Sequence, residues 1–186
     1  MVPLGQLLIP IALSALLVLV ASALVWLVLP HHRSDMKRLP DEAAALEALG
    51  KQALRPGVYR FPYASDPEAV HDAAFVAKLT RGPVGLLTVT APGPFSMSRA
   101  FGLSLLYCLG VSVFVAYLAG RTLPDGTAFL HVFRVAGAIA VAAYTAALLP
   151  GSIWWGRPWS HTLKDMADGL VYGLLTAGTF GWLWPR

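Results

Sequence analysis

The sequence predicts a mainly α-helical membrane protein: four transmembrane helices, with a small cytoplasmic α/β insertion between helices 1 and 2. Two observations support this fold class. Of the 186 residues, 56% are hydrophobic and only 13% are charged, which is about half the charge of an average soluble domain. Residues Leu7 to Leu29 contain no charged side chain, and a basic segment, Pro30 to Arg38, follows directly. Such an apolar run makes a helix of about 34 Å, enough to cross the ~30 Å hydrocarbon core of a bilayer.

The first element, residues 1–29, is predicted to be a retained transmembrane helix rather than a cleaved signal peptide. Its apolar run is longer than the roughly 7–15 residues of a signal-peptide core, and the basic residues follow it instead of preceding it. Because basic flanks stay in the cytoplasm, the N-terminus is predicted to lie outside.

The insertion, residues 30–98, is predicted to contain a helix, a strand, a helix and a strand in that order. The first helix is expected to start at Pro40 and run to about Ala53, because proline and acidic residues favour a helix start. The second helix is expected to start with Asp66 as its N-cap. Its expected buried stripe is Val70, Ala73, Ala74, Val76 and Ala77, and the expected strands are 58–61 and 84–90.

The strand–helix–strand part of the insertion could form a βαβ crossover, which would be right-handed. Two strands in so short a segment give a thin core. We therefore expect the insertion to lean on the membrane surface or on a partner chain.

Three more transmembrane helices are predicted within residues 99–186, at about 100–120, 128–149 and 165–184. The last one has a short apolar part, Gly169 to Trp184, so it must borrow length from the more polar residues before it. Ser160 is the expected N-cap of this helix, and Asp165 and Asp168 fall in its early turns.

The distribution of basic residues predicts the topology. Eleven of the fourteen lysines and arginines fall in 30–99 and 150–168, which are therefore assigned to the cytoplasm, with both termini outside. Tryptophan side chains favour the boundary between lipid and water. All six are expected there: Trp26, Trp154, Trp155, Trp159, Trp182 and Trp184.

Small residues recur every four positions in the second and fourth predicted helices. Such stripes let helix backbones approach closely, which drives helix association in lipid. They could form an interface between subunits or pack within the four-helix bundle, and the sequence favours packing within the bundle. The candidate packing residues are Ser104, Cys108, Ser112, Gly169, Gly173, Ala177 and Gly181.

His131 and Arg134 are the candidate polar residues inside the membrane, and an intramembrane charge is a functional hypothesis by default. Arg134, however, is expected about two turns from the outer interface, where it can snorkel or pair with Asp125 or the C-terminal carboxylate. A proton relay would need a carboxylate deeper in the bundle, and none is expected there.

The predicted cytoplasmic interface carries the candidate residues for binding lipid or a partner. The loop from Ser152 to His161 could form a docking platform, since Trp and Arg are common at binding hot spots, or it could anchor two helix ends. Asp35 and the basic residues beside it suit a collar of anionic lipid head groups. The candidates are His31, His32, Arg33, Lys37, Arg38, Trp154, Trp155, Arg157, Trp159 and His161.

No catalytic residue, cofactor or metal site is predicted. His31, His32 and His161 share the cytoplasmic side, but adjacent histidines are not expected to face one helical direction. The only cysteine, Cys108, rules out an internal disulfide and a cysteine-based metal site. The sequence holds no recognisable catalytic motif, and no nucleic-acid partner is expected.

Three stretches together resemble a group of uncharacterised bacterial membrane proteins. They are His31–Asp35 with Leu39–Glu42, then Gly82–Val89, and Ile153–Gly156 with Asp168–Leu170. The resemblance covers most of the chain. It implies the bacterial inner membrane, but it carries no activity, cofactor or catalytic residue. In that membrane both termini, which the basic residues assign to the outside, lie in the periplasm.

The leading functional hypothesis is a non-enzymatic scaffold or accessory subunit of a membrane complex, with lipid and either a second copy or another membrane protein as partners. A small transporter or channel formed by oligomerisation is the alternative, with a polar lining of Ser104, Ser112, Thr145, Thr176 and Arg134. A lipid-acting enzyme at the cytoplasmic face, using His31, His32, Asp35 or His161, is a further alternative.

Overall fold

A computed structural model describes all residues, Met1–Arg186, and divides them into two compact units. The helical unit consists of Met1–Met36 and Ser96–Arg186, and the insertion unit consists of Lys37–Phe95. The insertion unit thus begins at Lys37 rather than at residue 30. The segment 30–36, with its two histidines, belongs with the helices.

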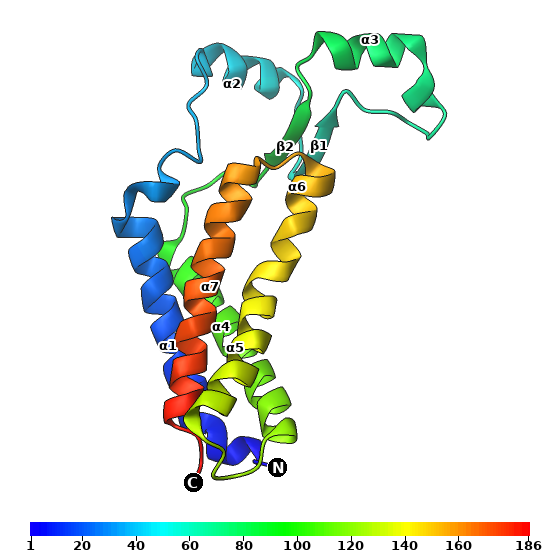
Figure 1. Ribbon diagram of the computed structural model, residues 1–186. Helices are drawn as coiled ribbons and strands as arrows, with labels where there is room; N and C mark the ends of the chain where they lie inside the picture. The colour runs from blue at the N-terminus through cyan, green and yellow to red at the C-terminus, as the bar shows by residue number, and fades with distance from the viewer. The chain divides into compact units, whose positions relative to one another are not determined.

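Long helices lie side by side in the helical unit, and both chain ends lie at the same end of this unit (Figure 1). Short 3₁₀ and π-helical turns extend α1 to Leu4–Val28, and another 3₁₀ turn joins α5 to α6. The helices are α1 (Leu8–Ala23), α4 (Met97–Thr122), α5 (Phe129–Thr145), α6 (Leu149–Trp155) and α7 (Trp159–Trp182).

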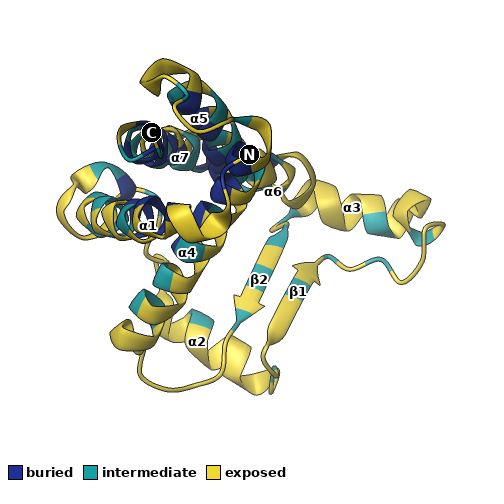
Figure 2. Ribbon diagram, turned by 90° about the horizontal axis from the view of Figure 1, so that it is seen from below, coloured by how far each residue is buried: buried dark blue, intermediate teal, exposed yellow.

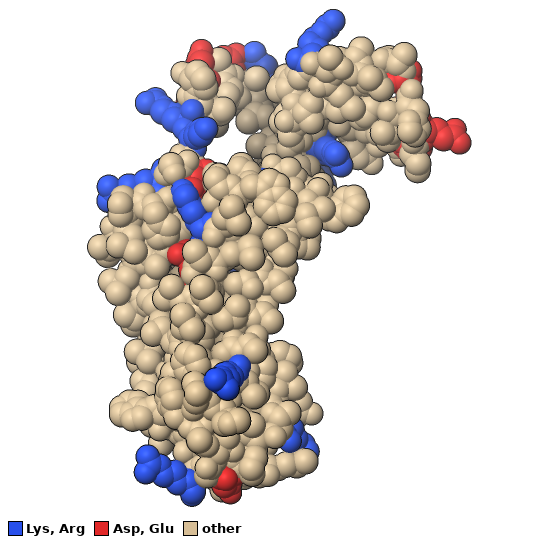
Figure 3. Space-filling model, in the orientation of Figure 1, with Lys and Arg blue, Asp and Glu red and all other residues tan.

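Three helical segments are long and apolar enough to cross a membrane: Leu4–Val28, Met97–Thr122 and Phe129–Trp155. The fourth predicted span, α7, is not among them, and it carries Lys164, Asp165 and Asp168 in its first turns. Four spans are therefore not confirmed. On the face that Figure 3 shows, most charged side chains of the helical unit lie toward its two ends, and one blue side chain lies between them. These features indicate association with a membrane.

Helices α5 and α7 approach each other closely because glycines on α7 leave room for the α5 backbone. A Cβ atom added to Gly173 would lie 3.0 Å from the backbone nitrogen of Val141, and one added to Gly181 would lie 2.8 Å from the ring of Phe129. The small residues of α7 are therefore used within one chain, as the sequence favoured.

The second stripe of small residues packs α4 against α1. Ser14 Oγ donates a hydrogen bond to Ser112 Oγ across this contact at 3.0 Å. Cys108 and Ser112 are buried, whereas Ser104 is exposed. Buried residues line the inward sides of the helices (Figure 2), so the core of the unit lies between them.

Several predicted boundaries around α7 are wrong. The helix starts at Trp159, after Pro158, so Ser160 lies inside it and is not its N-cap. Residues Ser152 to Trp155 belong to α6, which leaves only Gly156 to Pro158 as the connection; Gly156 ends α6 with a φ of 70°. That left-handed conformation suits glycine.

Trp184 packs inside the helical unit, and its expected place at the boundary between lipid and water stays a prediction. It is buried, and its indole Nε1 donates a hydrogen bond to the carbonyl oxygen of Pro124 at 3.0 Å. The end of the chain folds back over the α4–α5 connection, where Gly126 N also donates to the carbonyl oxygen of Pro185. Burial of the ring therefore follows from this fold-back. Trp182, in contrast, is exposed.

The insertion unit has the predicted order of helix, strand, helix and strand: α2 (Glu42–Lys51), β1 (Gly57–Phe61), α3 (Ala73–Arg81) and β2 (Gly85–Val89). The two strands pair antiparallel, with Gly57 opposite Val89 and Phe61 opposite Gly85, so the predicted βαβ crossover is wrong. A crossover helix covers a face of its parallel sheet, and α3 has no buried residue with which to do so.

Asp72, not Asp66, caps α3. Asp72 Oδ1 accepts a hydrogen bond from the backbone N–H of Ala74. Asp66 Oδ1 accepts one from the backbone N–H of Ala69, the first residue of the short 3₁₀ turn Ala69–His71. The expected buried stripe on α3 is also wrong, because no residue of the insertion unit is buried. The prediction of a thin core is confirmed. Its dependence on a membrane surface or a partner stays a prediction.

Candidate functional site

The end of α1 and the first half of α7 bring together a His–Asp cluster, which consists of His31, His32, Asp35 and Asp168. The two histidines lie in a single 3₁₀ turn that begins at Pro30. The π-helical turn that extends α1 ends at Val28, shortly before it. Proline suits the first position of such a turn and ends the preceding helix, because it has no backbone N–H to donate. Asp168 lies on α7 and is 8% exposed.

Both histidine rings reach the same carboxylate. His31 Nε2 lies 3.2 Å from Asp168 Oδ1, and His32 Nε2 lies 2.7 Å from Asp168 Oδ2. The expectation that adjacent histidines cannot face one direction is wrong here, because they follow the helix rather than continue it. Asp168 is therefore a buried carboxylate, although it lies near one end of the bundle and not deep within it.

Asp35 holds the other side of His32. His32 Nδ1 lies 2.6 Å from Asp35 Oδ2, so the imidazole is placed between two carboxylates. Lys164 Nζ donates to Asp35 Oδ1 at 2.6 Å, to Ser34 Oγ at 3.0 Å and to the carbonyl oxygen of His31. Asp35 is therefore part of the cluster, and the lipid head-group collar stays a prediction.

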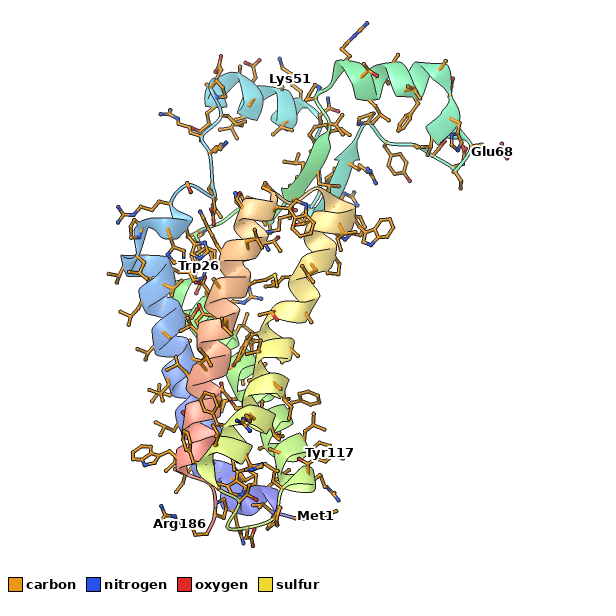
Figure 4. All side chains as sticks on the ribbon, viewed as in Figure 1. Met1, Trp26, Lys51, Glu68, Tyr117 and Arg186 are labelled. Atoms are coloured by element: carbon orange, nitrogen blue, oxygen red, sulfur yellow. The ribbon has the colours of Figure 1, made fainter.

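An aromatic side chain fixes the orientation of the His32 ring. Trp26, labelled in Figure 4 near the end of the first helix, stacks on this ring with centroids 4.0 Å apart and planes 5° from parallel. His161 lies at the edge of the cluster, with Nε2 3.8 Å from Asp35 Oδ1. The cluster thus takes its side chains from the segment after α1 and from α7, and Trp26, on the turn that extends α1, packs against it.

The charges in the cluster shift the pKa values of two of its members. Burial lowers the pKa of His32, but the hydrogen bonds and negative charges of Asp35 and Asp168 outweigh this effect, so the pKa is raised above its ordinary value. Hydrogen bonds from Lys164 and His32 lower the pKa of Asp35 to about 2. Both shifts favour the charged forms of these two side chains.

A cavity of about 280 Å³ lies beside the cluster, with walls from α1, α4, α5 and α7. Asp168 of the cluster belongs to the cavity wall, as does Trp26, whose ring stacks on His32. The Tyr144 ring forms T-shaped pairs with the rings of Tyr107 and Tyr172, with centroid distances of 5.9 Å and 5.8 Å. The wall also includes Val18, Leu19, Ser22, Ser104, Tyr107, Cys108, Leu148, Asp165, Gly169 and Tyr172.

Three polar atoms of the cavity-lining residues are buried and make no hydrogen bond: the hydroxyl oxygens of Tyr144 and Tyr172 and Oδ1 of Asp165. The other carboxylate oxygen of Asp165 accepts a hydrogen bond from Arg157. An unsatisfied buried polar group costs about 1–3 kcal/mol, so a native protein usually supplies water or another partner. A mostly apolar cavity with a few converging polar groups is typical of a small-molecule site.

Most of the other predicted site residues lie outside this region. His131 and Arg134 are exposed on α5, and Arg134 forms no ion pair with Asp125 or the C-terminus. Of the residues proposed to line a channel, Ser104 alone lines the cavity. Thr176 is fully buried, and its hydroxyl donates to the carbonyl oxygen of Tyr172.

The residues predicted to lie at the interface are mostly exposed. Trp154, Trp155 and Trp159 have at least half of their surface accessible. Arg157 pairs with Asp165 instead of standing free. Arg33, Lys37 and Arg38 are exposed, and Arg38 lies 3.4 Å from Glu42.

The sequence analysis missed the three cavity tyrosines and the role of Asp168. The tyrosines come from α4, α5 and α7, and no spacing in the sequence connects them. A signal for the aspartates was present: Asp165 and Asp168 lie about one turn apart directly before an apolar helix segment, where acidic residues are functional candidates. Their position is equally typical of the polar start of a helix, and that similarity hides the signal.

The helical unit therefore holds two features that chemistry could use, a charged His–Asp cluster and a cavity with unsatisfied polar atoms beside it. Comparison of the chain with protein-family models, curated proteins and solved structures finds no match. The chemistry of the site is consequently the main guide to function.

Proposed function

We propose that this chain is an integral membrane protein that binds a lipid-like molecule with a hydroxyl or amino head group in the cavity between α1, α4, α5 and α7. The observation that carries the proposal is the set of three buried, unsatisfied polar atoms on Tyr144, Asp165 and Tyr172, three residues that line one cavity. A ligand that bonds to them would remove a penalty of about 1–3 kcal/mol for each atom.

The chemistry of the wall selects the kind of head group. Asp165 Oδ1 can only accept a hydrogen bond while the carboxyl is ionised, so the ligand must offer a donor. Asp165 and Asp168 repel a phosphate. The aliphatic side chains of Val18, Leu19 and Leu148 suit a hydrocarbon chain. We therefore propose a neutral or cationic amphipathic ligand and not an anionic phospholipid.

The proposed setting is the bacterial inner membrane, with both termini in the periplasm and the His–Asp cluster near the cytoplasmic interface. The basic-residue count supports this orientation. The scaffold hypothesis also stays a proposal, but the small-residue stripes lend it little support because they are used in packing within the chain. The channel hypothesis stays a proposal with one of its lining residues at the cavity.

The test is a thermal unfolding experiment on the full chain in mild detergent, with monooleoylglycerol and dioleoyl phosphatidate as probes. We expect monooleoylglycerol to raise the unfolding temperature of the wild type in a saturable manner, and phosphatidate not to do so. Replacing Tyr144→Phe together with Tyr172→Phe should abolish the shift, because the two hydroxyls that bind the head group are gone.

The matched control is Tyr117→Phe, since Tyr117 is an exposed tyrosine on α4 that does not line this cavity (Figure 4). This variant should respond like the wild type. An equal shift in the double variant, or no saturable shift in the wild type, would contradict the proposal. The second result would assign the cavity to water.

A further inference from the structure

We infer that His31, His32 and Asp168 bind one divalent transition-metal ion, of the class that includes Zn²⁺. One ligand atom from each residue, Nε2 of the two histidines and a carboxylate oxygen of Asp168, lies within 4.8 Å of the other two. In a tetrahedral zinc site with bonds of about 2.0–2.2 Å, ligand atoms are about 3.3–3.6 Å apart. Small side-chain adjustments would therefore bring all three atoms to bonding distance.

The chemistry of the ligands suits a borderline metal ion. Two imidazole nitrogens and one carboxylate oxygen make a set typical of Zn²⁺ and Fe²⁺, whereas Mg²⁺ and Ca²⁺ prefer oxygen ligands. Neutral histidines with one carboxylate leave a net positive charge on the bound ion. The second carboxylate, Asp35, is close enough to compensate part of it.

Asp35 and Trp26 prepare His32 for this role. A metal-binding histidine usually donates its other ring N–H to a carboxylate, which fixes the tautomer and strengthens the ligand. Here His32 Nδ1 lies 2.6 Å from Asp35 Oδ2, and this leaves Nε2 to face Asp168. Lys164 holds Asp35 from the other side, and the stacked Trp26 ring restricts rotation of the imidazole. Asp35 is thus a positioning residue.

Three protein ligands leave at least one coordination position open, as in catalytic rather than structural zinc sites. Asp168 also belongs to the wall of the cavity, so a molecule bound there lies next to the proposed ion. The metal site goes beyond the proposed lipid binding and does not depend on it, because the three ligands are present whether or not the cavity holds a lipid.

The test is a titration of the purified, chelator-treated full chain with Co²⁺, followed by visible absorption, and then displacement of the Co²⁺ by Zn²⁺. We expect one Co²⁺ per chain with the spectrum of a site containing nitrogen ligands. His32→Ala and Asp168→Asn should lose this spectrum. Asp35→Asn should keep the stoichiometry but bind about 10- to 100-fold more weakly, as expected for loss of a carboxylate that supports a ligand.

His71→Ala and His131→Ala are the matched controls, because both histidines are exposed and lie outside the cluster. Both variants should keep wild-type affinity. Should Asp168→Asn fail to fold, His31→Ala provides the second variant, since the His31 side chain is 35% exposed. The inference is overturned if the wild type takes up no Co²⁺, or if folded His31→Ala and His32→Ala proteins bind it as tightly as the wild type.

Discussion

The two halves of α7 make different kinds of contact with the rest of the helical unit. The second half presents glycines to α5, and the backbones approach until an added Cβ would meet Val141 or Phe129. The first half presents Lys164 and Asp168 to the turn after α1, and its contacts are hydrogen bonds and ion pairs. The second half of α7 joins the bundle by close packing, and the first half carries part of a charged site beside a cavity.

This difference shows where the chain departs from the simplest membrane helix. Close packing of small residues is sufficient to join helices in lipid, so the second half needs no charge. Buried charged groups are costly unless they are well paired, so the first half must pair each of them. A helix that carries such groups at the edge of an otherwise apolar bundle is a candidate for function.

The largest expected loss of stability follows from a substitution in the second half of α7, which packs closely on α5. Gly173→Leu should destabilise the protein by about 3 kcal/mol or more, because the new side chain meets the Val141 backbone and forces α5 and α7 apart. Gly178→Leu is the control, since nothing lies within 4 Å of a Cβ added there. Reversible unfolding by SDS in mixed micelles measures both. Equal losses of stability in the two variants would show that the contact between α5 and α7 is not close-packed.

A smaller loss of stability is expected from a substitution in the first half of α7, which carries the charged residues. Asp168→Ala should destabilise the metal-free protein by about 2–3 kcal/mol, because it removes the partner shared by His31 and His32 while their rings stay in place. Asp125→Ala, in an exposed connection, should change stability by less than about 0.5 kcal/mol. If the same unfolding experiment finds both variants neutral, the cluster contributes nothing to stability.

The smallest effect is expected where the cluster is partly exposed. Lys164→Met should cost about 1–2 kcal/mol, since Asp35, Ser34 and the carbonyl of His31 lose a common donor. The control is Lys51→Met, which breaks a pair with Glu47 that is largely exposed and is worth about 0.3–0.5 kcal/mol. A loss at Lys164 no larger than at Lys51 would mean that water already replaces these bonds.

The sequence predicted much of the helical unit correctly. Long uncharged segments and their basic flanks located the three apolar helices, and the four-residue repeat of small residues located the surfaces that pack within the chain. Segment order in the insertion was also predicted correctly. These properties depend on local composition and on helical periodicity, which are read along one stretch of chain.

The direction of pairing in the insertion could not be predicted in the same way. A strand, a helix and a strand in sequence are compatible with parallel or antiparallel pairing. The choice depends on whether the helix packs on the sheet, and α3 does not. The N-cap of α3 was predicted wrongly for a related reason. Asp66 and Asp72 are both residues that favour an N-cap position, and Asp66 bonds to the 3₁₀ turn that lies between them.

The sequence by itself determined that this chain has apolar helices with basic ends and which of their faces can approach closely, because those properties follow from composition and from a period of 3.6 residues. Only the tertiary structure decided that His31 and His32 meet Asp168 across 136 residues of chain, and that tyrosines from three helices surround one cavity. Such contacts depend on how separate helices are placed, and no local pattern encodes that placement.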